Sequence, residues 1–139
     1  MKITVCGSLK FINEMKEVKL KLKQLDHEVL MPESAIESKD QNYWNNLMND
    51  NPQECSRIRG ERIKLHFNKI NSSEAILILN YSKKEKENYI GANTFLEMGY
   101  AFGVDKKIFV LNQLPKDHHY EELIAMNPIC LYGDLNLIN

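Results

Sequence analysis

The hydrophobic positions of the chain follow two spacings, and the change between them along the sequence predicts alternating strands and helices. Residues 2–6 (KITVC) form a short β-branched run that ends at Gly7-Ser8, as expected for a first strand. Between residues 10 and 25 the apolar side chains recur at intervals of mainly three and four, which predicts a helix. These side chains are Phe11, Met15, Val18, Leu22 and Leu25.

The same two patterns continue to the end of the chain. Strands are predicted at residues 27–31, where Pro32 ends the run, and at residues 75–80 (AILILN), 107–112 (KIFVLN) and 128–132 (PICLY). Helical spacing is found over residues 58–71, through residues 94–103 and over residues 119–126. Residues 33–53 are polar and only weakly periodic, so we expect a long loop there of the functional or mobile kind.

This alternation predicts a single α/β domain over residues 1–139. The run at 75–80 is apolar at nearly every position, which is typical of a central strand covered on both faces. With right-handed crossovers, the best match is a flavodoxin-like three-layer sandwich with a five-stranded parallel sheet of order 2-1-3-4-5.

Composition narrows the class of protein without naming a partner. Of the 139 residues, 43% are hydrophobic and 27% charged, and the net charge of -1 gives no reason to expect a nucleic acid polymer as ligand. The three cysteines are widely spaced and suggest neither a disulfide framework nor a metal site, so we expect a reducing, cytoplasmic setting. We also expect no exported or membrane-spanning segment, because no apolar run is long enough.

The expected strand order also predicts where a ligand would bind. In an open parallel sheet, ligands lie beyond the carboxyl ends of the strands where the order reverses, here between the first and third strands. The Gly7-Ser8 turn ends the first strand, and the path from Asn80 to Gly91 and Glu97 begins at the end of the third. Both features should therefore border one crevice.

The first turn has two interpretations. Unpaired backbone N–H groups at the start of the following helix favour an anion such as phosphate, to which Ser8 could add a hydroxyl and Lys10 a charge. Alternatively, Gly7 only permits a tight turn and Ser8 is an N-cap worth about 1 kcal/mol to the helix.

Glu97 is the most conspicuous polar residue of the chain, because it stands in an apolar and aromatic segment (GANTFLEMGYAFG). Such a carboxylate is costly to desolvate and is a candidate nucleophile or acid-base group. The structural alternative is a capping box, in which Thr94 caps the helix and Glu97 reaches back to the backbone of the cap.

Other residues give weaker signals. His66 could face the crevice, although a lone helical histidine is more often packed or solvated, and His118-His119 have no ligand-like spacing. Motifs typical of ATPases, dinucleotide oxidoreductases, esterases and zinc proteases are absent, and no metal or other cofactor is expected.

Three segments together resemble the nucleoside 2-deoxyribosyltransferase family, including its small relatives that hydrolyse nucleotide N-glycosidic bonds. These segments are CGSLKF after the first strand, AILILN, and IGANTFLEMGYAFGVDKKIFVLN. The resemblance implies a flavodoxin-like fold, a homodimer or higher homo-oligomer, and a nucleoside or nucleotide as the small-molecule partner. It also implies that Glu97 attacks the anomeric carbon of the sugar and that Gly7, Ser8 and Lys10 contact the substrate.

The chain departs from the family near the leaving base. Where the family commonly has acidic residues, this chain has Asn80, Gly91 and Asn93. The leading hypothesis is cleavage or transfer at an N-glycosidic bond, with Glu97 as nucleophile and with Gly91, Asn93 and Asn112 among the substrate-binding groups. The alternatives are a non-catalytic nucleotide-binding or signalling module of the same fold, and a structural protein in which Glu97 only caps a helix.

Overall fold

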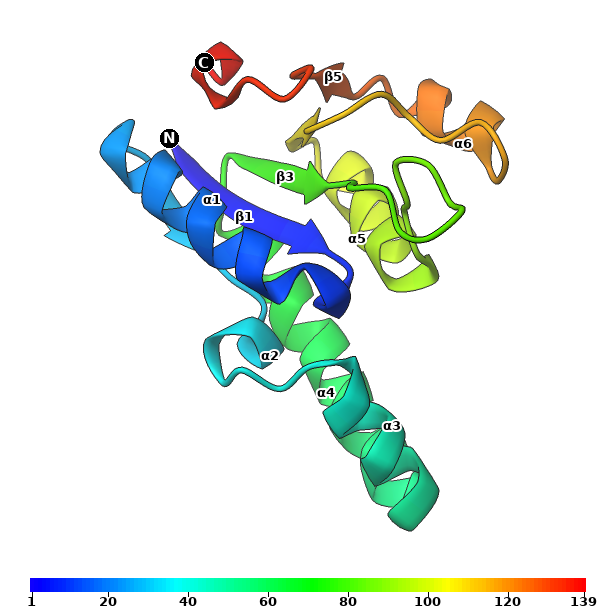
Figure 1. Ribbon diagram of the computed structural model, residues 1–139. Helices are drawn as coiled ribbons and strands as arrows, with labels where there is room; N and C mark the ends of the chain where they lie inside the picture. Colours follow the sequence, from blue (N-terminus) through cyan, green and yellow to red (C-terminus); the bar gives the residue numbers. More distant parts are fainter.

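The computed structural model describes residues 1–139 and contains a five-stranded sheet of order β2-β1-β3-β4-β5 in which every pair is parallel (Figure 1). The strands are β1 (Lys2–Gly7), β2 (Glu28–Leu30), β3 (Ala75–Leu79), β4 (Lys107–Val110) and β5 (Ile129–Cys130). The predicted flavodoxin-like fold and strand order are thereby confirmed.

Alternate side chains of β3 enter two separate hydrophobic cores. Leu77 and Leu79 pack in the core under α1 (Ile12–Gln24), whereas Ile76 and Ile78 pack in the core under α4 (Pro52–Asn71) and α5 (Ala92–Gly103). Successive strand residues point to opposite faces, so a strand that is apolar throughout needs cover on both sides. The helices on the two faces of the sheet supply this cover and make the three layers (Figure 1).

The turn after β1 leads into a short 3-10 helix that the sequence did not predict. A 3-10 helix, η1 (Leu9–Phe11), precedes α1, and Ser8 caps it because its hydroxyl accepts a hydrogen bond of 3.3 Å from the Lys10 N–H. Ser8 is therefore an N-cap, as one of the two interpretations predicted, and the 3-10 helix that it caps is three residues long.

The predicted loop at residues 33–53 is wrong, because most of this segment is helical. It contains α2 (Glu33–Ile36) and α3 (Gln41–Asp50), and α3 lies along α4 in a helical hairpin that projects from the sheet (Figure 1). Asp40 caps α3 by accepting a hydrogen bond of 3.0 Å from the Tyr43 N–H. Trp44 is the one buried residue of α3. The apolar side chains of this helix do recur at helical spacing, but the stripe is short and lies among asparagines and other polar residues. It consists of Tyr43, Trp44, Leu47 and Met48.

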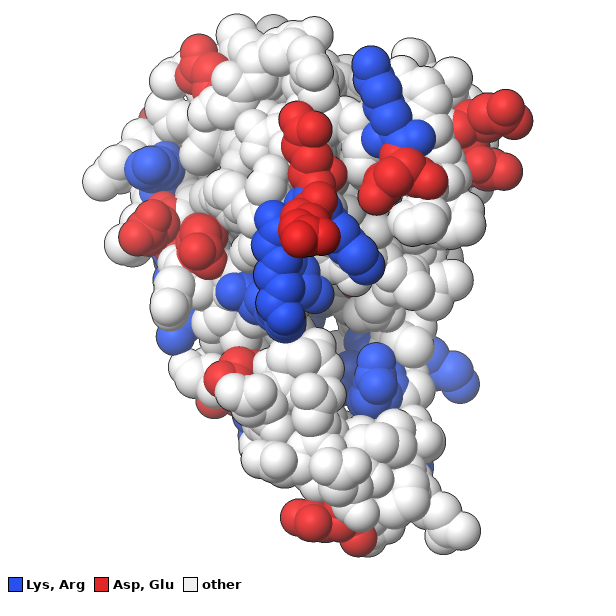
Figure 2. Space-filling model, turned by 45° about the vertical axis from the view of Figure 1, so that its right-hand side comes forward, with Lys and Arg blue, Asp and Glu red and all other residues white.

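The remaining elements complete the sheet's surroundings. α6 (Tyr120–Ala125) precedes β5, and a short 3-10 helix, η2 (Leu135–Leu137), lies near the end of the chain. In the view of Figure 2, acidic and basic side chains are interspersed. None of the helices is both long and apolar enough to cross a membrane.

The central position of β3 predicts the effect of a core substitution. Leu77 is fully buried, so Leu77→Ala should lower the free energy of unfolding by about 2–5 kcal/mol through lost burial and a residual cavity. Leu20→Ala is the control, because Leu20 is 63% exposed on α1 and its truncation should change stability by less than about 0.5 kcal/mol. Urea denaturation measures both, and equal losses would contradict the assignment of β3 as the core strand.

Candidate active site

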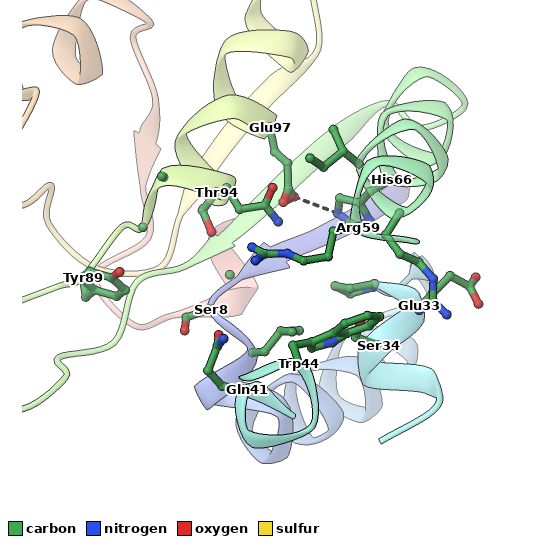
Figure 3. A pocket seen from close by; sticks show the side chains of 18 residues that line it. Ser8, Glu33, Ser34, Gln41, Trp44, Arg59, His66, Tyr89, Thr94 and Glu97 are labelled. Atoms are coloured by element: carbon green, nitrogen blue, oxygen red, sulfur yellow. Dashed lines mark ion pairs between the residues drawn. The ribbon is translucent and has the colours of Figure 1, made fainter. Parts of the chain in front are cut away.

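A cavity of about 270 Å³ opens at the carboxyl ends of β1 and β3, where the strand order reverses (Figure 3). Its walls come from the turn after β1, the segment after β2, α3, the middle of α4, and the loop and first turns of α5. The lining residues are Gly7, Ser8, Leu9, Pro32, Glu33, Ser34, Gln41, Trp44, Arg59, Arg62, Ile63, His66, Tyr89, Gly91, Ala92, Asn93, Thr94 and Glu97. The Gly7-Ser8 turn and Glu97 thus border one cavity, as we predicted from the sequence.

Glu97 lies on the buried face of α5 rather than at its cap. The helix begins at Ala92 with Gly91 as N-cap, so Thr94 is already inside the helix and the capping-box interpretation is wrong. Glu97 shares a buried stripe with Thr94, Met98 and Ala101, at the three- and four-residue spacing of one helix face. The side chain is only 7% exposed, so the buried carboxylate needs a polar partner.

His66 of α4 is that partner. Its Nε2 lies 3.0 Å from Glu97 Oε2, close enough for an ion pair when the imidazole is protonated (Figure 3). The two atoms are close but poorly aligned, because Glu97 Oε2 makes no hydrogen bond. His66 and Glu97 meet because α4 and α5 pack side by side on the same face of the sheet.

Cys6 completes the polar cluster. As the neighbour of Val5 in β1 it points to the opposite face, toward α4 and α5, and its Sγ lies 3.4 Å from His66 Nε2. Burial raises the pKa of the Cys6 thiol well above its ordinary value, and the negative charge of Glu97 raises it further. Without a bound cation the thiol is therefore neutral at physiological pH.

The cavity also contains an unpaired cation. Arg57 pairs with Glu54 and Glu61, and Arg62 pairs with Glu37. Arg59, from the same helix, has no carboxylate within 4.0 Å and extends into the cavity (Figure 3). A guanidinium with free donors at a cavity wall is suited to a phosphate or carboxylate. The sequence did not single out Arg59, because all three arginines lie in one polar stretch of α4.

The other predicted site residues divide into two groups. Gly7, Ser8, Gly91 and Asn93 line the cavity with Glu97. At Gly91 the backbone runs so close to Tyr89 that an added Cβ would lie 2.9 Å from its hydroxyl, so a side chain there would displace the tyrosine from the wall.

Two predicted residues lie elsewhere. Lys10 is exposed and does not line the cavity, and its pKa is lowered, first by repulsion from Lys83. Asn112 joins the ends of β3 and β4, because its N–H donates to Asn80 Oδ1 and its side-chain amide donates to the Asn80 carbonyl. Lys10 and Asn112 therefore both lie outside the cavity.

Comparison with known proteins adds little to this description. No family model matches the chain, and no curated protein matches it. A solved structure of a 2-deoxyribosyltransferase from the psychrotolerant bacterium Bacillus psychrosaccharolyticus is similar over 80% of this chain and 72% of that one, with 14% sequence identity and a TM-score of 0.49. A likeness this low carries no argument about the site, which rests on the residues described above.

The setting of Cys6 predicts a dependence of stability on pH. A thiol that stays protonated in the folded state contributes stability below its ordinary pKa of 9.0, and this contribution is lost as pH rises above that value. The free energy of unfolding should fall by up to about 1.4 kcal/mol per pH unit in that range because of Cys6. Urea denaturation between about pH 8 and about pH 10, with a chelator and a reductant present, measures this slope. Cys6→Ala should give a flatter profile, and identical slopes in the two proteins would contradict the buried neutral thiol.

Proposed function

We propose that this protein cleaves or transfers the N-glycosidic bond of a nucleoside or nucleoside 5′-monophosphate, with Glu97 as nucleophile. The observation that carries the proposal is the position of the Glu97 carboxylate, buried in the wall of a cavity that also holds the Gly7-Ser8 turn. The resemblance of the segments around these residues to nucleoside 2-deoxyribosyltransferases supports the same assignment. A cavity of about 270 Å³ is close to the lower end of the usual range for small-molecule sites.

The reaction proceeds in two displacements. A carboxylate oxygen of Glu97 forms a bond to the anomeric carbon while the bond from that carbon to the base breaks, and the electron pair leaves with the base nitrogen. The base takes up a proton from water. Water or a second base then attacks the anomeric carbon from the vacated side and loses a proton to solvent, while the bond from that carbon to Glu97 breaks and releases a carboxylate.

His66 acts on the nucleophile rather than on the leaving base. The attacking and leaving groups of a displacement occupy opposite faces of the carbon, and His66 is in contact with the attacking carboxylate at 3.0 Å. It therefore contacts the nucleophile from α4 and, when protonated, can form an ion pair with its carboxylate. The base would then lie on the side away from His66, where Tyr89 lines the cavity (Figure 3).

Arg59 favours a phosphorylated substrate. Its guanidinium is the cavity's free cation, and a 5′-phosphate would give it a charged partner that no residue of the chain supplies. Ser8, from the turn opposite, adds a hydroxyl to the same cavity. Together these groups support a nucleoside 5′-monophosphate over an unphosphorylated nucleoside.

Replacement of the nucleophile tests the proposal directly. Glu97→Gln keeps the size of the side chain but cannot attack, so release of free base from a panel of nucleosides and 5′-monophosphates should fall by at least about a thousandfold. Chromatography measures the base, and Glu121→Gln, on exposed α6, is the control that should keep full activity. Release that survives Glu97→Gln would exclude Glu97 as nucleophile. Ligand-induced thermal stabilisation without any release would favour the non-catalytic binding module.

The role of Arg59 gives a separate prediction. Arg59→Ala should weaken binding of a 5′-monophosphate by about tenfold to a hundredfold, because hydrogen bonds between charged partners are lost. Binding of the matching unphosphorylated nucleoside should change by less than about twofold. Calorimetric titration measures both ligands, and Arg57→Ala is the matched control from the paired face of the same helix. An equal loss for both ligands would contradict phosphate recognition by Arg59.

A further inference from the structure

The cluster of Cys6, His66 and Glu97 has the composition and spacing of a metal site. The three side chains are buried, come from β1, α4 and α5, and each offers one ligand atom. These atoms all lie within 4.8 Å of one another, with His66 Nε2 3.4 Å from Cys6 Sγ and 3.0 Å from Glu97 Oε2. The three atoms thus surround a common point.

Hydrogen bonds within this cluster cannot pair all of its buried polar atoms. His66 Nε2 faces both a thiol and a carboxylate oxygen, but it has either one proton or one lone pair to offer them. In the observed arrangement Glu97 Oε2 is buried without a hydrogen bond, as is His66 Nδ1. Such unpaired buried atoms are costly, and a cation at the common point would give Glu97 Oε2 a partner.

The distances suit a tetrahedral ion. With typical bond lengths to zinc, a tetrahedral site places a ligand nitrogen about 3.6 Å from a thiolate sulfur and about 3.4 Å from a carboxylate oxygen. The observed separations of 3.4 and 3.0 Å are slightly shorter, so His66 needs to move away from each partner by a few tenths of an ångström. Cys6 Sγ and the Glu97 oxygen lie within 4.8 Å of each other, against about 3.6 Å in such a site, so this pair needs to approach by at most about 1.2 Å.

We propose that Cys6, His66 and Glu97 bind a thiophilic divalent cation, with Zn²⁺ as the preferred ion and a fourth position open to the cavity. A thiolate with an imidazole selects zinc-like ions over Mg²⁺ and Ca²⁺, which prefer oxygen ligands. On binding, the Cys6 thiol gives its proton to solvent and its sulfur forms the bond to the ion, so affinity decreases as pH falls. Because His66 Nδ1 has no hydrogen-bond partner to orient the ring, binding is weaker than at structural zinc sites.

This site shares Glu97 with the proposed reaction but does not depend on it. A carboxylate oxygen bound to an ion is a poor nucleophile, so Zn²⁺ should inhibit any glycosidic activity that uses Glu97. Metal binding can be measured without turnover. Cobalt binding at this cluster without base release would contradict the proposed function and support the metal site. Base release without cobalt binding would support the proposed function and contradict the metal site.

A titration of the full chain with Co²⁺, a spectroscopic substitute for Zn²⁺, tests the site. After treatment with a chelator and a phosphine reductant, the protein should bind one equivalent of Co²⁺. A thiolate-to-cobalt charge-transfer band should appear, and Zn²⁺ should abolish it. Cys6→Ser should lose the band, and His66→Ala should weaken Co²⁺ binding by at least about tenfold. Cys55→Ser is the matched control, because Cys55 is also buried but its thiol contacts the Trp44 carbonyl, outside the cluster.

Several results would overturn the site. The proposal fails if the wild-type chain gives no charge-transfer band, if the band persists in Cys6→Ser, or if Cys55→Ser removes it. Circular dichroism verifies that each variant is folded. If Cys6→Ser does not fold, His66→Ala and Glu97→Gln carry the comparison, and unchanged Co²⁺ affinity in both would equally exclude the cluster.

Discussion

Burial of β3 on both faces is the constraint on which the rest of this structure depends. A strand without polar positions has to be covered on both sides, and this places α1 on one face of the sheet and α4 and α5 on the other. The parallel crossovers then bring the carboxyl ends of β1 and β3 to one edge, with the first turns of α5 beside them. The position of the cavity is therefore set by the helices that cover the two faces of β3.

The same packing creates an unusual polar cluster inside an apolar layer. Cys6 belongs to the core under α4 and α5, and His66 and Glu97 enter that layer from the buried faces of the two helices. Each polar group reduces the local hydrophobic stabilisation, and their mutual contacts offset this only in part because the hydrogen bonding is incomplete. A buried polar cluster with such a cost in stability is typical of a functional site. The proposed nucleophilic attack and the proposed metal binding use the same carboxylate, so occupancy of the cluster by an ion would suppress the attack.

Several features could be predicted because they depend on local patterns. The strands and most helices follow from hydrophobic spacing, and Glu97 stands out as the lone charge in an apolar helix. The α3 helix was missed although its apolar side chains recur at helical spacing, because this stripe is short and lies in a polar, asparagine-rich segment. The capping box failed for a related reason, since α5 begins three residues earlier than Thr94 would require, where no side chain makes the cap.

The layered fold and the region of the cavity could be predicted from the sequence alone, because hydrophobic periodicity is a property of short segments. The strand order was chosen as a common order for sheets of this kind, and the structure agrees with it. Only the tertiary structure brought Cys6 and His66 to Glu97, left Arg59 as the unpaired arginine of α4, and moved Lys10 and Asn112 away from the cavity. These relations join residues that are as much as 91 positions apart in the chain, counted from Cys6 to Glu97. Contacts at such separations are set by how helices pack on the sheet, and no local pattern records them.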